Sequence, residues 1–157
     1  MQIQRWQSVM LLIAAAVMAC FTFCTVCQIA TPTETLSLSS LGYHYEGIPT
    51  DGAPSGWFQH TWYFFILSLL CIAFPLTAIF LYKNLRLQKR VTAVSILFAM
   101  ADFCVAVILG SNVIENGEAS FNYSVMSAPV IAAIALWLAW CYISRDQKLL
   151  ASVDRIR

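Results

Sequence analysis

The sequence predicts an all-α membrane protein folded as a bundle of four transmembrane helices, and its composition and apolar runs are the basis for this. Of its 157 residues 60% are hydrophobic and 11% charged, and the mean hydropathy is +0.72. A soluble domain carries about 25% charged residues. A membrane-spanning helix needs about 20 apolar residues. Runs of about that length lie at about 8–29, 61–82, 91–114 and 126–143, so we expect one integral membrane domain over residues 1–157.

Charged residues divide the predicted connections into two kinds. The outer connections, 30–60 and 115–125, carry acidic residues and no cation. The N-terminus, the hinge 83–90 and the tail 144–157 carry the cations: Arg5, Lys83, Arg86, Lys89, Arg90, Arg145, Lys148, Arg155 and Arg157. Because Lys and Arg near span ends stay in the cytoplasm, both termini are expected there. Topology explains the basic residues, so we expect no nucleic-acid binding.

The first apolar run, 8–29, has a rival interpretation as a signal peptide. Arg5 precedes the apolar run, and the residues from Val17 to Cys20 resemble a lipoprotein cleavage box. However, the apolar run continues beyond Cys20 to Ile29, where a mature lipoprotein would become polar. We therefore interpret it as a retained helix.

The outer connection 30–60 is rich in Pro and Gly and is not predicted to be helical. Two short pieces, Thr35–Ser39 and Gly42–Glu46, have the alternation or aromatic content of strands, which favours a small β-hairpin or sheet. The stretch Phe121–Ser124 would add a third strand. An irregular loop fits the same residues, and the sequence leaves both alternatives open.

Small side chains mark the expected helix contacts, because close packing rather than water brings helices together in a bilayer. Bulky residues such as Phe64, Phe65, Ile79 and Phe80 are expected to face lipid in part, and Pro75 to kink its helix. Matching stripes of small or polar residues occur on the third and fourth spans: Ser95, Ala99, Asp102, Ala106 and Gly110, and Ala128, Ala132, Ala135 and Ala139.

Asp102 is the candidate polar site within the membrane. An ionised carboxylate at mid-span costs about 2.5–3.5 kcal/mol on insertion scales. Because it shares a stripe with small residues, it is expected to face protein. It would serve as a proton or cation site or contact a partner; the alternative is a neutral carboxyl hydrogen-bonded to a neighbouring backbone group or hydroxyl. Polar residues at its depth on a second span would support an ion-coupled role, and only Ser68 and, less well, Thr22 come near.

Other residues gave weaker hypotheses. Cys20, Cys24 and Cys27 have an iron–sulfur spacing, but on one face of a rigid helix they would pack as small apolar residues. A metal site in the outer loop would use His44, Glu46, Asp51 and His60, in a spacing typical of no zinc site. We expect no metal, cofactor or catalytic group.

Three stretches carry a family resemblance: Met1–Val9, Phe80–Arg90 and Arg145–Arg157. The chain resembles the family of small four-helix membrane proteins of Bacteroidetes-type bacteria known as domain of unknown function 4293. The resemblance implies an inner-membrane protein with four spans and no assigned activity.

The expected function is that of a structural or interaction subunit rather than an enzyme. The hinge and tail cations Arg86, Lys89, Arg90, Arg155 and Arg157 would bind anionic lipid or an acidic partner, if they do more than set topology. The expected partners are the lipid bilayer and a membrane protein or further copies of the chain. The alternative function is a small transporter or ion-coupled module using Asp102.

Overall fold

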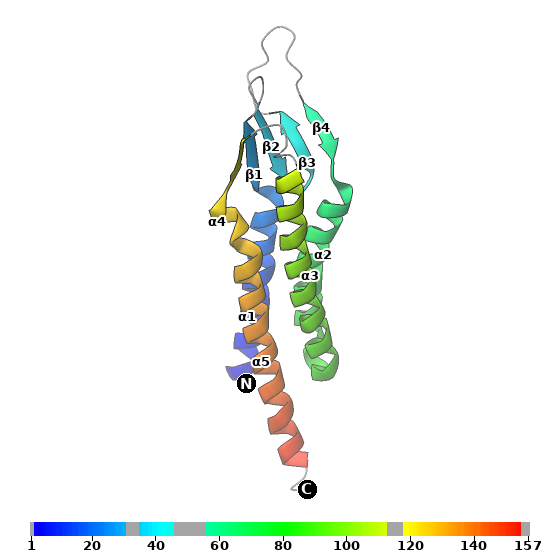
Figure 1. Cartoon of the computed structure of the whole chain (residues 1–157). Coiled ribbons are helices and arrows are strands. Elements are labelled where there is room, and N and C mark those ends of the chain that lie inside the picture. The colour runs from blue at the N-terminus through cyan, green and yellow to red at the C-terminus, as the bar shows by residue number, and fades with distance from the viewer. Residues whose placement is uncertain (1, 31–34, 46–55, 113–117, 155–157) are drawn as a thin grey trace.

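The computed structural model describes residues 2–30, 35–45, 56–112 and 118–154. Four long helices run side by side, and a small sheet covers one end of them (Figure 1). The long helices are α1 (Gln2–Phe23), α2 (Trp62–Phe80), α3 (Leu85–Asn112) and α5 (Ala128–Asp154). The short elements are η1 (Leu81–Lys83) after α2 and α4 (Tyr123–Met126) before α5.

The long helices form a ring in which α1 and α3 each pack against both α2 and α5. The small-residue stripes face inward as predicted: Ala99 and Ala106 of α3 and Ala132 and Ala139 of α5 are almost completely buried. Small side chains let the helix backbones approach closely.

Each long helix is apolar and long enough to cross a membrane, over Trp6–Phe23, Trp62–Lys83, Leu85–Ser111 and Tyr123–Leu150. Their outward faces carry large apolar side chains, such as Leu97 at 70% exposure and Phe80 at 80%. A soluble protein rarely exposes apolar patches of such extent. The fold is therefore mostly helical, with helices of membrane-spanning character and a small antiparallel sheet.

The first helix ends earlier and the last one later than the sequence predicted. α1 ends at Phe23, and residues 27–29 of the predicted span 8–29 belong instead to strand β1 (Cys27–Ala30), which is paired on both sides. α5 continues through the predicted tail to Asp154 instead of ending at 143, because the stretch 144–154 contains no Pro or Gly to stop a helix.

The basic hinge is also more helical than predicted. After η1 the turn is the single residue Asn84, whose Oδ1 accepts the backbone N–H of Leu87 at 3.3 Å. Arg86, Lys89 and Arg90 of the predicted hinge 83–90 therefore lie in the first two turns of α3.

The sheet combines both outer connections. Its strands are β1 (Cys27–Ala30), β2 (Thr35–Ser39), β3 (Gly42–Tyr45), β4 (Trp57–His60) and β5 (Glu118–Phe121), antiparallel in the order β4-β3-β2-β1-β5. The β2–β3 hairpin is the one predicted, whereas β5 shares only Phe121 with the predicted third strand and pairs with β1.

The sheet rests on the helix ends through its buried side chains, among them Ile29 and Leu38. At Gly110 of α3 an added Cβ would lie 2.4 Å from Cε1 of Phe121, so the absence of a side chain here makes room for the Phe121 ring of β5. Below the sheet, Phe64 of α2 packs edge-on against Phe21 of α1 with ring centroids 6.1 Å apart. Both rings are fully buried, so the expectation that Phe64 faces lipid was wrong.

Candidate functional site

Asp102 lies inside the bundle, where α3 meets α2. The side chain is fully buried, and the hydroxyl of Ser68 lies 2.9 Å from Oδ1 and 3.1 Å from Oδ2. A hydroxyl has one proton, so Ser68 donates to one carboxyl oxygen at a time. Asp102 thus faces protein, as predicted, and its hydrogen-bond partner is Ser68, the residue expected near its depth on the second span. Thr22, the other candidate, instead donates to the carbonyl of Met18 in its own helix.

The surroundings of Asp102 on α2 are polar but uncharged. Cys71, one turn along from Ser68, is buried and close enough to interact electrostatically with Asp102. Pro75, another turn on, has no N–H to donate to the carbonyl of Cys71. In the part of the chain that the structure describes, Asp102 has no hydrogen bond or ion pair with a cation. The arrangement can hold a proton on Asp102, but it does not provide a countercharge.

The hinge cations lie at the end of the bundle opposite the sheet. Arg86 and Arg90 are exposed, whereas Lys89 is half-buried with its ammonium 4.7 Å from the ring centroid of Trp140 on α5. Such a cation–π contact helps to hold α3 against α5. The other two predicted contact residues, Arg155 and Arg157, lie outside the described residues.

Polar contacts at this same end join three helices, which the sequence did not reveal. Gln7 of α1 donates a hydrogen bond from Nε2 to Oδ2 of Asp146, and Gln147 donates from Nε2 to the carbonyl of Leu85 at 2.7 Å. Two further buried atoms, Oε1 of Gln88 and Oγ of Ser144, have no hydrogen-bond partner within the described structure. The sequence feature that could have predicted these contacts is the pair of glutamines, Gln7 and Gln88, near the ends of apolar helices.

Aromatic rings form a continuous row of contacts along the sheet edge that leads into α2. His44 lies 5.2 Å from Trp57, Trp57 lies 5.1 Å from His60, and His60 lies 5.4 Å from Trp62, measured between ring centroids. A register shift between β3 and β4 produces this arrangement, because it allows Trp57 and His60 to share one side of the strand. The rings of β4 and of Trp62 are exposed.

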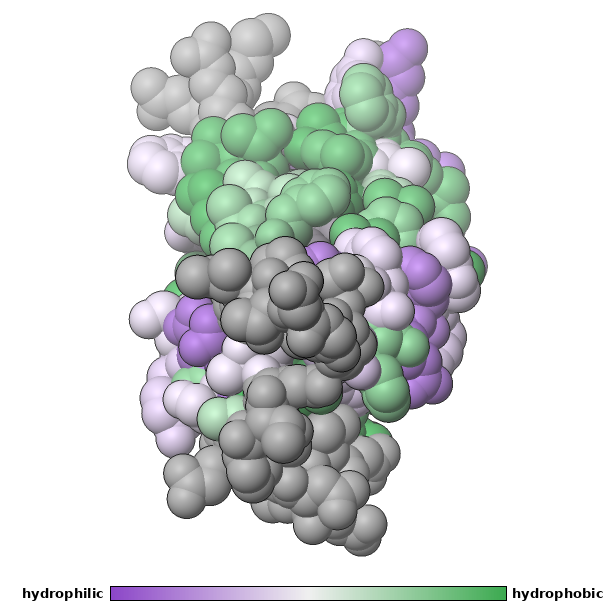
Figure 2. Space-filling view, turned by 90° about the horizontal axis from the view of Figure 1, so that it is seen from above, coloured by the Kyte–Doolittle hydropathy of each residue, from purple (hydrophilic) through white to green (hydrophobic). Residues whose placement is uncertain are grey.

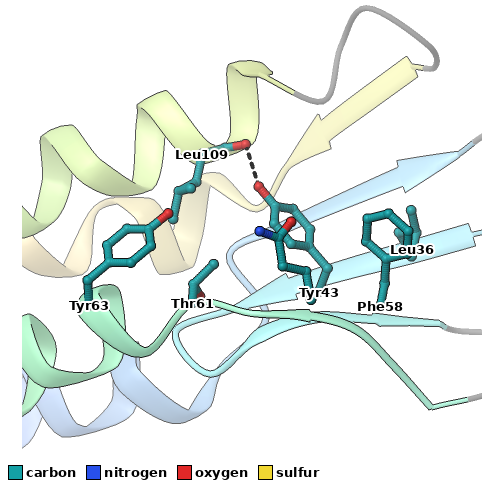
Figure 3. Close-up of a pocket in the computed structure, with 7 residues that line it drawn as sticks. Leu36, Tyr43, Phe58, Thr61, Tyr63 and Leu109 are labelled. Atoms are coloured by element: carbon teal, nitrogen blue, oxygen red, sulfur yellow. Dashed lines mark hydrogen bonds between the residues drawn. The ribbon is translucent and has the colours of Figure 1, made fainter.

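On its other side the sheet edge helps to form a cavity of about 270 Å³ above the ends of α2 and α3. Tyr43 points across it and donates a hydrogen bond from its hydroxyl to the carbonyl of Leu109 at 2.9 Å, as Figure 3 shows. Burial, with smaller contributions from Tyr63 and Cys27, raises the pKa of Tyr43 to about 12. The lining is mostly apolar and aromatic: Leu36, Tyr43, Phe58, Gln59, Thr61, Tyr63 and Leu109. Sequence periodicity could not predict this cavity, because its walls come from five elements, β2, β3, β4, α2 and α3.

The remaining hypotheses concern cysteines and metal. Cys20 and Cys24 are exposed near the end of α1, whereas Cys27 is buried in β1, where burial raises its pKa. The spacing in the sequence predicted that the three thiols share one face of a helix. That expectation was wrong, because Cys27 lies in strand β1. No three His, Cys, Asp or Glu side chains gather as a metal site among residues 2–30, 35–45, 56–112 and 118–154. Glu46 and Asp51 of the outer-loop hypothesis lie outside these ranges.

Comparison with known protein families assigns the chain to a family. A family model described as "Domain of unknown function (DUF4293)" matches residues 3–156. The chain belongs to the DUF4293 family. No curated protein matches the sequence. The DUF4293 match extends over all four long helices and all five strands, so the capped bundle as a whole corresponds to the family domain.

Proposed function

We propose that this DUF4293 protein is an integral protein of the bacterial inner membrane that crosses it four times, with both termini in the cytoplasm. The outward apolar faces of the four long helices support insertion. The cations near the turn after α2 and near the end of α5 support a cytoplasmic position for that end, because positive residues are retained there. The sheet then lies on the outer side.

Within the membrane, the protein acts as an interaction or accessory subunit rather than as an enzyme. The observation that carries this proposal is the exposed aromatic edge of the sheet: Trp57 is 46% exposed and Phe58 is 60% exposed. Exposed aromatic side chains beside polar ones are typical of protein interfaces. From above, apolar side chains gather over part of the sheet end, next to polar ones (Figure 2).

The partner that fits this edge is another membrane protein whose outer segment presents apolar side chains. The row of ring contacts from His44 to Trp62 starts on the sheet and ends at the first residue of α2. A partner in the same membrane therefore reaches it by moving within the membrane plane. At the cytoplasmic end, the exposed Arg86 and Arg90 bind anionic lipid headgroups or an acidic partner segment.

Affinity purification from the native membrane tests this function. A stoichiometric membrane protein is expected to copurify with the wild-type chain and to be lost with the double substitution Trp57→Ala, Phe58→Ala. The control is Leu97→Ala, which truncates a more exposed apolar side chain within α3, away from the sheet. Recovery of further copies of this chain alone would make it a homo-oligomer instead. Equal recovery of the partner with all variants would refute the role of the edge.

A second function is favoured by the Asp102–Ser68 pair: a small ion-coupled module that binds a proton at Asp102. A buried carboxyl with a hydroxyl partner and no cation is suited to gaining and losing a proton. Asp102→Asn keeps the shape of the side chain and cannot titrate. If the Asn variant fully rescues a deletion phenotype, this function is ruled out.

A further inference from the structure

The buried face of α3 is polar over the part that leads from its first turns to Asp102. Its side chains are at most 1% exposed, and steps of three or four residues keep them on one face of the helix. At 1.5 Å per residue the stripe is about 21 Å long. In chain order it consists of Gln88, Thr92, Ser95, Ala99 and Asp102, with one alanine among the polar residues.

This stripe presents mainly hydrogen-bond acceptors. Thr92 and Ser95 donate their hydroxyl protons to the backbone carbonyls of Gln88 and Val91, each at 2.9 Å. The lone pairs of both hydroxyl oxygens are then available, and Oε1 of Gln88 is buried without a partner. Buried water usually binds such groups, because it can donate two hydrogen bonds and is costly to remove.

Directly beyond Asp102, toward the sheet, the buried side chains form an apolar layer. Ala106 and Leu109 continue the face of α3, and the buried rings of Phe21 and Phe64 pack against each other at the top of the bundle. Nearer the sheet lie the buried hydroxyls of Thr22, Ser40, Thr61 and Tyr43, each of which donates to a backbone carbonyl. The apolar layer of Ala106, Phe21 and Phe64 separates Asp102 from these hydroxyls and offers water no side-chain hydrogen-bond partner.

We infer that Asp102 exchanges its proton with one side of the membrane only, through water held along the stripe from Gln88 to Ser95. The inference rests on the second function proposed above, and in the proposed topology that side is the cytoplasm. The ligand is a proton carried by water. Hydronium protonates the carboxylate, which leaves water and a neutral carboxyl hydrogen-bonded to Ser68, and the reverse step returns the proton to the same side.

Few titratable groups accompany this route. From α2 the Cys71 thiol faces Asp102. Residues Trp6–Phe23 of α1 carry no charged side chain. Gln147 of α5 contacts Leu85, so the charged residues of α5 lie level with the start of α3. Leu85 is 17 residues, or about 25 Å of helix, from Asp102. The charged residues near the entrance are Arg86, Lys89, Arg90, Arg145, Asp146 and Lys148.

Infrared spectroscopy of the full-length protein in lipid vesicles tests the inference. The carboxyl C=O band of protonated Asp102 is identified by its loss in Asp102→Asn, and its shift after transfer to D2O reports proton exchange. Thr92→Val is expected to slow this exchange by about tenfold or more, because a buried water loses a polar partner. The matched control Thr22→Val removes a buried hydroxyl that likewise donates to its own helix, but near the sheet.

The outcomes separate the inference from the function on which it rests. Slower exchange in Thr92→Val and in the smaller change Ser95→Ala, with wild-type exchange in Thr22→Val, supports the route. Equal exchange in all variants overturns the route but leaves a proton site at Asp102. If no protonated-carboxyl band disappears in Asp102→Asn at any pH, both the proton site and the route are overturned. Circular dichroism confirms that each variant has folded.

Discussion

At the residue scale, Ser68 and Asp102 show how a carboxyl can be kept inside an apolar bundle. Each is fully buried, and each is the hydrogen-bond partner of the other across the α2–α3 contact. A buried polar group that loses its partner costs much more than the net gain from the original bond. The pair is therefore important for stability whether or not Asp102 binds a proton in function.

The first prediction concerns this pair. Ser68→Ala removes the donor to Asp102, and we expect the free energy of unfolding to fall by about 1–3 kcal/mol. Thermal unfolding in detergent measures the effect. Thr77→Ala is the control, because Thr77 is exposed and its hydroxyl donates to a carbonyl of its own helix. Equal melting temperatures for the two variants would show that the buried hydrogen bond does not stabilise the bundle.

The second prediction concerns pH and Tyr43. Its pKa is raised from 10.0 to about 12 in the folded protein, so the folded state holds the phenol proton more tightly than the unfolded state. This contribution to stability is complete below pH 10 and is lost as the pH rises toward 12. Unfolding of the wild type should therefore show a decline in stability over this interval. Tyr43→Phe should show a smaller decline, and an unchanged decline would contradict the assignment.

At the element scale, the boundary between α1 and β1 depends on pairing rather than on composition. Residues 27–29 continue the apolar run of α1, and the length of that run assigned them to the helix. They become a strand because β2 and β5 satisfy their backbone groups on both sides. Both partners come from elsewhere in the chain, and β5 comes from about 90 residues later. A local pattern cannot contain this information.

The third prediction tests helix contacts. Ala106→Leu adds volume to a fully buried position on α3, and we expect a loss of about 1–3 kcal/mol in stability from overpacking. Ala135→Leu, on the inward face of α5, should behave in the same way. The control is Ala101→Leu, because Ala101 lies on the exposed face of α3. If thermal unfolding shows that Ala101→Leu loses as much stability as Ala106→Leu and Ala135→Leu, the small-residue stripe is wrongly assigned to the inward face.

At the scale of the whole molecule, the two ends of the bundle differ in chemistry. One end has the sheet, the aromatic edge and the cavity at Tyr43, and the other has the cations and the long α5, which extends past the other helices (Figure 1). Charge asymmetry of this kind orients a membrane protein. The polar stripe of α3 runs from Asp102 toward the cation end of the bundle.

The fourth prediction is the orientation itself. A compartment reporter fused after Arg157 should be active in the cytoplasm, and one inserted after Ile48 should be active on the opposite side of the membrane. Replacing Arg86 and Arg90 with Glu should increase the fraction of misoriented chains, because it removes retained positive charge. Two reporters active in one compartment would refute a fold that crosses the membrane four times.

The sequence alone determined the four apolar helices, the inward face of α3 with Asp102, and the asymmetry of charge. These features depend on length, helical spacing and residue type, which are local properties of a chain. Only the tertiary structure decided that α1 ends at Phe23, that both connections join in one sheet, and that Ser68 is the partner of Asp102. Each of these depends on groups far apart in sequence satisfying one another's backbone or polar atoms, which a pattern along the chain does not record.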